Sequence, residues 1–161
     1  MRAIGRRAQV DPALIVHYFG SKDGLLREAL TLPLDPAAVL SEALAGVPAD
    51  RVGQELVRRV VQVWDSPEMT LLLLSLLRTA VSHDLAMTYL RDMLQRTVIA
   101  AVSCLVGEDD AQRRAELVAA QMWGVAVTRY LLRLPALAAM TPDDLARTVG
   151  PSVQQYLAGE A

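Results

Sequence analysis

The sequence predicts an all-α protein in which three short N-terminal helices precede a larger helical bundle. Leu and Ala make up 50 of the 161 residues, and both residue types favour helices. Aromatic residues are only 4% of the chain, and no long stretch is rich in the β-branched residues that strands prefer. Proline and glycine recur along the chain, and apolar residues at helical spacing fill the intervals between them.

Most of the predicted helices begin or end near one of these breaks. The last one contains Pro151, and we expect a kink there because proline has no backbone donor. Residues 1–31 are expected to form one unit and residues 36–161 another. The expected helices cover residues 2–8, 12–19, 22–31, 36–45, 50–65, 68–81, 84–106, 109–134 and 142–157.

The first helices carry clear boundary signals. Asp11 can cap the second helix, and Pro12 occupies its first position, where the missing donor costs nothing. Ser21 can cap the third helix, and Gly20 permits the sharp turn before it. Two short helices joined tightly through residues 9–11 have the proportions of a helix-turn-helix.

Basic residues are concentrated at the N-terminus. Residues 1–30 hold five basic and three acidic side chains, although the whole chain has a net charge of −2. This small excess is compatible with DNA approaching that end. The apolar residues there can form one face, made of Ile4, Ala8, Val10, Ile15, Phe19, Leu25 and Leu26. The outer surfaces are left to Arg6, Arg7, His17, Tyr18 and Lys22.

The run AIGRRAQVDPALIVHYFGSKDGLL, residues 3–26, resembles the DNA-binding motif of the tetracycline-repressor (TetR) family. Its most specific part is HYFGSK, residues 17–22. The resemblance implies that residues 12–19 are the recognition helix of a helix-turn-helix. The side chains it would present to the major groove are Pro12, Ala13, Leu14 and Val16, with His17 on the same outer surface.

The chemistry of these positions differs between the two ends of the motif. The N-terminal side chains of the recognition helix are apolar, so they can contact thymine methyl groups but offer few hydrogen bonds for direct readout. Tyr18 and Lys22 match family positions that contact DNA phosphates. The family commonly has an aromatic residue at the position of Val16, and this chain departs from that pattern.

A second departure concerns the start of the chain. Family members carry a further helix before the position of Met1, so we expect this chain to be N-terminally shortened and its operator binding to depend on that helix. An apolar surface is then expected to be exposed around Ile4, Phe19 and Leu25. The alternative for residues 1–31 is a helical hairpin that touches no DNA.

The long helix over residues 109–134 has charged residues only near its ends. A helix that is apolar on nearly every side is expected to be buried on every side, which in a small chain favours a subunit interface. The family arrangement, in which the last two long helices of each subunit form a four-helix bundle, agrees with this. We therefore expect a homodimer through residues 109–134 and 142–157.

The resemblance also implies a site for a small apolar effector between helices of the body. Most candidates are large apolar or aromatic side chains, namely Trp64, Met69, Met87, Tyr89, Met93, Met122, Trp123 and Tyr130. Gln121 and Ser103 are the candidate polar anchors. The alternative for any one of these residues is ordinary packing in the core.

No catalytic, metal-binding or cofactor motif stands out. The chain has two widely separated histidines, one cysteine and no glycine-rich phosphate loop. Cys104 lies in an apolar run and is expected to pack as a small hydrophobe, which fits a reducing cytoplasm. No apolar run approaches the roughly 20 residues that span a bilayer.

These observations favour a ligand-responsive transcriptional repressor without a cofactor. We expect it to bind operator DNA as a homodimer and to be released by a small apolar effector. The alternative is a helical small-molecule-binding dimer that has lost DNA binding. An enzyme that uses a buried helical pocket is disfavoured, because the constellation of residues that catalysis needs is missing.

Overall fold

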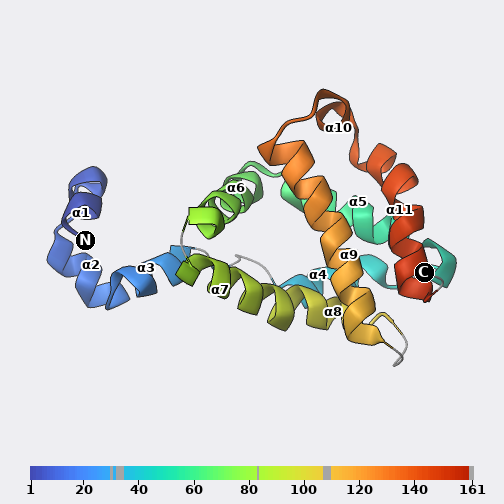
Figure 1. Cartoon of the computed structure of the whole chain (residues 1–161), viewed down its shortest axis with the longest axis horizontal. Coiled ribbons are helices and arrows are strands. Elements are labelled where there is room, and N and C mark those ends of the chain that lie inside the picture. The colour runs from blue at the N-terminus through green and yellow to red at the C-terminus, as the bar shows by residue number, and fades with distance from the viewer. Residues whose placement is uncertain (30, 32–34, 83, 107–109, 160–161) are drawn as a thin grey trace.

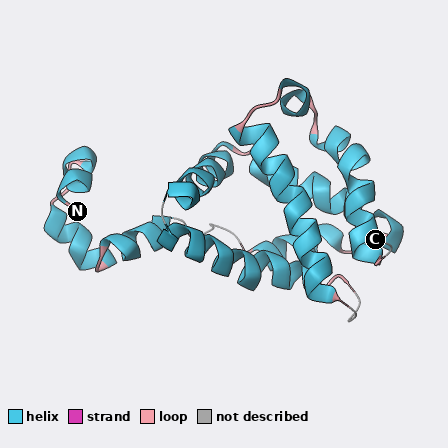
Figure 2. Cartoon of the chain, viewed as in Figure 1, coloured by secondary structure: helices cyan, strands magenta, loops and turns pink. Residues whose placement is uncertain are grey.

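The computed structural model describes residues 1–29, 31, 35–82, 84–106 and 110–159. Every regular element within these residues is a helix, which confirms the predicted all-α class (Figure 2). Figure 1 shows three short helices projecting as an arm from a body of longer helices. The arm meets the body where α3 contacts α7.

The arm follows the predicted boundaries closely. Asp11 caps its second helix through Oδ1, which accepts from the backbone N–H of Ala13 at 2.8 Å. Ser21 caps the third helix in the same way, since its Oγ accepts from the N–H of Gly24 at 2.9 Å. Gly20 has a φ of +68°, a value that favours glycine in the turn between them. The three helices are α1 (Arg2–Ala8), α2 (Pro12–Phe19) and α3 (Lys22–Ala29).

The body contains the remaining helices. A 3₁₀ turn, η1 (Ala49–Arg51), leads into α5, and a short helix absent from the prediction, α10 (Pro135–Ala139), precedes the last one. The longer helices are α4 (Pro36–Leu44), α5 (Val52–Trp64), α6 (Pro67–Ser82), α7 (Asp84–Met93), α9 (Ala111–Ala126) and α11 (Pro142–Ala158). Among them, α4, α5, α6 and α11 lie within a residue or two of the expected ranges, whereas α7 and α9 begin near the expected residues and end earlier.

Two of the predicted helices change their winding before they end. The expected helix over 84–106 continues from α7 into a π-helical segment, η2 (Leu94–Ile99), and then into α8 (Ala100–Ser103). The expected helix over 109–134 continues from α9 into a second π-helical segment, η3 (Val127–Leu131). Apolar spacing does not distinguish these wider turns from α-helix, and π-turns within α-helices are frequent at functional sites.

Helices α5 and α11 pack with their backbones in contact. A Cβ atom on Gly53 would lie 2.6 Å from the backbone nitrogen of Gln154, and one on Gly150 would lie 2.8 Å from Cα of Gln54. The N–H of Gly53 also donates to Oε1 of Gln154 at 2.7 Å. α11 is one continuous helix that contains Pro151.

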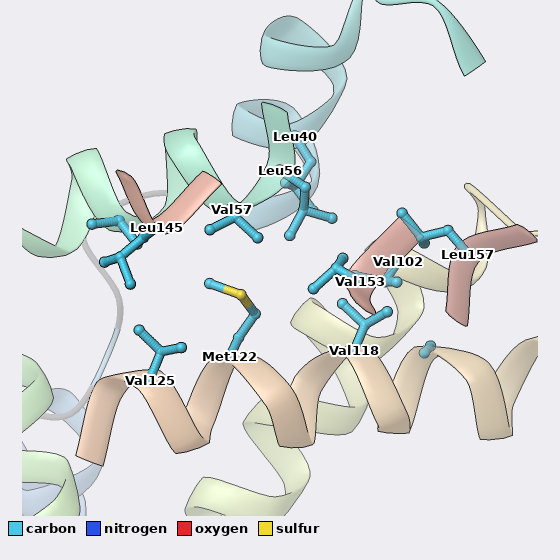
Figure 3. Packing of buried hydrophobic residues seen from close by; sticks show 12 residues of the cluster. Leu40, Leu56, Val57, Val102, Val118, Met122, Val125, Leu145, Val153 and Leu157 are labelled. Carbon is cyan, nitrogen blue, oxygen red and sulfur yellow. The ribbon is translucent and has the colours of Figure 1, made fainter. Parts of the chain in front are cut away.

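The main core fills the space between α5, α9 and α11, with α4 and α8 closing it (Figure 3). Figure 3 shows Met122 pointing from α9 toward Val57 on α5, and Val125 pointing toward Leu145 on α11. The cluster consists of buried aliphatic side chains from all five helices. Its members include Leu40, Leu56, Val57, Val61, Val102, Val118, Met122, Val125, Leu145, Val153 and Leu157.

Two parts of the body, one face of α9 and the residue Cys104, are exposed at the surface. α9 buries one face within the chain, whereas Leu117, Ala120 and Gly124 on the other face are exposed. Cys104 is exposed rather than packed in the core, because helix α8 ends at Ser103 and the chain turns at the surface there.

Among the described residues, no single helix combines the length and apolar character needed to cross a membrane. One pair, Ala49–Trp64 and Pro67–Thr79, meets that test only when joined across a bend of 92°.

Candidate functional site

The outer face of α2 carries most of the residues expected to contact DNA. Ile15 is buried and Phe19 half-buried, so these two side chains define the inner side of the helix. At about 100° per residue, Ala13, Leu14 and His17 lie on the opposite side, and all three are exposed. The exposed fractions are 49% for Leu14, 46% for Val16 and 76% for Tyr18.

Pro12 is the exception among the expected contact residues. Its side chain is half-buried and lies beside Gly5 of α1, where an added Cβ would be 3.0 Å from Cγ of Pro12. Pro12 therefore begins α2 and packs against α1, and its side chain does not lie on the outer face. Lys22, by contrast, is exposed as expected.

The N-terminal tip of α2 has no free backbone donor. Pro12 has no N–H, and the N–H of Ala13 is used by the Asp11 cap. The N–H groups of Leu14 and Ile15 donate to the carbonyl oxygen of Asp11 at 3.0 and 3.4 Å. The tip is therefore an apolar surface with its polar backbone already satisfied.

The start of α3 has a different chemistry. Tyr18 and Lys22 are exposed on either side of the Gly20 turn, and the rings of His17 and Tyr18 meet edge to face at 5.3 Å. The first N–H groups of a helix have no intrahelical partner and attract anions. A hydroxyl, an ammonium group and a helix N-terminus here can together contact phosphate oxygens.

The apolar surface expected around Ile4, Phe19 and Leu25 is not found, because these side chains are half-buried. α2 contacts both α1 and α3, and these contacts cover the three side chains in part. The exposed large apolar side chains of the arm lie instead on the turn before α2, at Val10, and on α2 itself.

A cavity of about 130 Å³ lies in the body between α5, α6, η2 and α9. Five of the expected effector-binding residues line it, whereas Met87 is exposed and Gln121 is half-buried away from it. The side chain of Tyr89 lies outside the described residues. The five lining residues are Trp64, Met69, Met93, Met122 and Trp123.

The described lining is almost entirely apolar. It consists of Pro, Val, Leu, Met, Ala and Trp side chains, and no charged residue is among them. The expected polar anchors Gln121 and Ser103 are not part of the lining. The polar side-chain atoms are the indole nitrogens of Trp64 and Trp123. An engineered apolar cavity of about 150 Å³ stays dry and takes up benzene, so a cavity of this size and chemistry can hold a small uncharged molecule.

A polar cluster formed by Asp65, Arg129 and Tyr130, the Asp65 cluster, lies next to the Trp64 wall of the cavity. Asp65, which follows the last residue of α5, accepts hydrogen bonds from the guanidinium of Arg129 at 3.2 Å and from the hydroxyl of Tyr130 at 2.8 Å. The Arg129 guanidinium also donates to the carbonyl oxygens of Leu137 and Met140, at 2.6 and 2.7 Å. These bonds tie η3 to the ends of α5 and α10.

Tyr130 belongs to this cluster and not to the cavity lining where it was expected. Burial raises the pKa of its hydroxyl, and the hydrogen bond to the Asp65 carboxylate raises it further, so the group stays a neutral donor. Its ring meets the ring of Trp64 edge to face at 6.3 Å. The cluster therefore fixes the position of one cavity wall.

A layer of apolar side chains, made of one packed cluster, connects the cavity to the arm. Leu26 of α3 packs with the buried residues Leu76 and Leu90. The same cluster contains Leu72, Met93, Leu94 and Trp123, and these four together with Leu76 line the cavity. A molecule that pushed this layer outward would therefore press on α3.

Comparison with known proteins agrees with this arrangement. Residues 50–157 match the model of the tetracyclin repressor-like C-terminal domain, and residues 1–29 match that of the bacterial regulatory proteins of the tetR family. The chain belongs to the TetR family. The predicted family is thereby confirmed, and this TetR-family protein is a transcriptional regulator with a helix-turn-helix DNA-binding domain rather than an enzyme.

Among solved structures, this TetR-family chain is similar to a TetR-family regulator from Streptomyces coelicolor A3. The two share 30% sequence identity with a TM-score of 0.60, and the match covers 96% of this chain and 80% of the other. No curated protein matches the chain.

Proposed function

We propose that this TetR-family regulator represses transcription by binding operator DNA as a homodimer, and that a small uncharged apolar effector releases it. Residues 1–31 are the DNA-reading unit in this proposal, and residues 36–161 bind the effector and dimerise. The observation that carries the proposal is the shared layer of side chains between the cavity and Leu26, since it links effector occupancy to the reading unit.

The reading unit is supported by the exposed face of α2 and the phosphate-binding chemistry at the start of α3. Ala13, Leu14, Val16 and His17 would lie in the major groove, while Tyr18 and Lys22 would contact the backbone. Phosphate contacts supply affinity and salt dependence, whereas base contacts supply sequence preference. The two groups of residues are therefore separable by experiment.

The homodimer is supported by the exposed face of α9. Leu117, Ala120 and Gly124 form a mostly small, uncharged face that the chain itself leaves uncovered, and small side chains let helices approach closely. We propose that this face and α11, within residues 109–134 and 142–157, pair with the same elements of a second copy. A two-fold dimer would place two recognition helices on half-sites about one DNA turn apart or somewhat more.

The effector class is supported by the cavity. Its described lining carries no charged side chain that could pair with a charged ligand, and burying an unpaired charge is costly. Release requires the effector to bind the DNA-free conformation more tightly than the DNA-bound one. A molecule larger than the present cavity would meet this condition, because it must displace the layer that Leu26 contacts.

DNA binding is tested by fluorescence anisotropy with an operator selected from random duplex DNA. Lys22→Ala should weaken binding to every sequence and lower the slope of log affinity against log salt by about one. Arg96→Ala is the matched control, because Arg96 is an exposed basic residue on η2 in the body. An unchanged slope for Lys22→Ala would contradict the phosphate role.

The effector class is tested with two probes of similar size, toluene and benzoate. Toluene should raise the melting temperature, whereas benzoate should not because its carboxylate would be buried without a partner. Naphthalene, a larger apolar probe, should also weaken operator binding, because it must displace the layer that Leu26 contacts. Light scattering at several concentrations tests the homodimer. A dimer that takes up toluene but binds no DNA would favour the alternative, a small-molecule-binding protein without DNA function.

A further inference from the structure

We propose that the recognition helix reads its half-site through the C5 methyl groups of thymines, with Leu14 as the main contact and Ala13 beside it. The inference rests on the proposed DNA binding and goes beyond it, because it states which chemical groups of the DNA are recognised. It predicts an operator with thymines at the positions that face the N-terminal half of α2.

The tip of α2 offers almost no hydrogen bonds to a base edge. Residues 12–15 carry no hydrogen-bonding side chain, and their backbone N–H groups are absent or already bonded to Asp11. The Asp11 carboxylate itself accepts from Ala13 as the helix cap. Neither the side chains nor the backbone N–H groups of residues 12–15 can therefore donate to O6 and N7 of guanine or N7 of adenine, and these side chains cannot accept from the amino groups of adenine and cytosine.

The same face of α2 presents exposed apolar side chains. Leu14 is an isobutyl group with 49% of its surface exposed, although large apolar side chains normally gain by burial. Ala13 and Leu14 point away from the inner side marked by Ile15, so both would face the floor of the groove. His17, one turn further along this face, is the remaining side chain there that can hydrogen bond to a base.

This apolar face is complementary to the methyl groups of thymine. In the major groove, thymine alone among the four bases presents a methyl group, and apolar side chains recognise it by contact. Burying one methyl against Leu14 gives a preference of about fourfold over the same base without it. Two such contacts in each half-site would dominate sequence preference at the positions under the tip.

The experiment removes the methyl groups from the DNA and leaves the base pairing unchanged. An operator is selected from random duplex DNA with the full chain, and each thymine is then replaced in turn by deoxyuridine. Affinity, measured by anisotropy, should fall about fourfold at the thymines under the tip. It should recover when 5-bromodeoxyuridine is used, because bromine occupies nearly the same space as the methyl group.

Leu14→Ala locates the contact on the protein. This variant should reduce the deoxyuridine effect at the same positions to less than twofold, and it should fold normally because Leu14 is exposed and alanine favours helix. Leu71→Ala is the matched control, since Leu71 is an exposed leucine on α6 in the body, and it should keep the full effect.

The outcomes separate the inference from the function on which it rests. Sequence-specific binding that is indifferent to deoxyuridine at every position overturns methyl readout and leaves DNA binding intact. A deoxyuridine effect that persists unchanged in Leu14→Ala overturns the role of Leu14. Failure of the full chain to bind any DNA overturns the proposed function and the inference together.

Discussion

The backbone contact between α5 and α11 can be tested by adding a single methyl group at Gly53. Gly53→Ala would place a Cβ atom 2.6 Å from the backbone nitrogen of Gln154 and 2.7 Å from the carbonyl oxygen of Gly150. Both neighbours are backbone atoms, so neither can rotate away as the end of a side chain could. The two helices must separate to admit the methyl group.

The expected effect is a loss of about 2 kcal/mol in the free energy of unfolding. Alanine gains about 1 kcal/mol over glycine in a helix interior. Forcing a methyl group into a filled contact costs roughly 1–3 kcal/mol. Separating the helices also weakens the hydrogen bond from Gly53 to Gln154, which is worth about 1 kcal/mol. For a chain of this size the melting temperature should fall by about 4 to 8 °C.

Urea denaturation followed by circular dichroism measures this change. Gly124→Ala is the matched control, because a Cβ atom added to Gly124 in α9 would have nothing within 4 Å, and this variant should gain stability from helix propensity. Since Gly124 is on the proposed dimer face, both variants should be compared at several protein concentrations. Gly53→Ala as stable as the parent chain would refute the backbone contact.

Three further changes test other parts of the fold. Leu26→Ala should speed amide exchange in α3 but not in α9, because the variant loses the packing that holds the arm to the body. Thr141→Ala should cost about 1 kcal/mol in urea denaturation at neutral pH, since it removes the cap of α11. The bonds that Thr141 donates to the Asp144 carboxylate hold the pKa of that group below its ordinary value. The part of the effect that comes from these bonds is present above the ordinary carboxyl pKa and is lost as pH falls through the lowered one. Tyr130→Phe should lower stability by about 1 kcal/mol in thermal melts, because Asp65 loses one of its hydrogen bonds.

Each of these changes has a conservative control. Leu71→Ala removes an exposed leucine and should leave exchange in α3 unaltered. Thr141→Ser keeps the capping hydroxyl and should keep most of the stability. Tyr156→Phe tests a half-buried tyrosine outside the Asp65 cluster.

Equal exchange rates in α3 for Leu26→Ala and the parent chain would show that the arm is held in another way. A cap contribution independent of pH would contradict the role of Asp144, and equal effects of the two tyrosine changes would contradict that of the Asp65 cluster.

The helix boundaries of the arm could be predicted because their signals are local. Asp11, Pro12 and Ser21 each act on a backbone group within three residues, and the structure places each bond where the sequence suggests it. The π-helical segments could not be predicted in the same way. They depend on how η2 and η3 pack against other helices, and their apolar spacing is close to that of an α-helix. α10 was missed because five residues are too few to show a period.

The sequence predicted an apolar cavity in the body, but it predicted only some of the residues that line it. Large apolar residues such as Trp64 and Met122 were expected to line it and do, but Gln121 points elsewhere although it is the direct neighbour of Met122. Which side of a helix faces a cavity depends on the packing angle of that helix, which one sequence does not give. The Asp65 cluster was missed for a related reason, since Arg129 lies 64 residues away and neither residue stands in a recognisable motif.

The layer shared by the cavity and Leu26 constrains how the specificity of such a regulator can evolve. Under the proposed function, a substitution in Leu72, Leu76 or Met93 that accommodates a new ligand also alters the cluster in which Leu26 packs, so it would change expression in the absence of ligand. Substitutions on the far wall, for example at Val39 or Val60, avoid this second effect. Divergence toward new ligands should therefore accumulate first on the far wall, while changes in the shared layer should need compensating substitutions in α3.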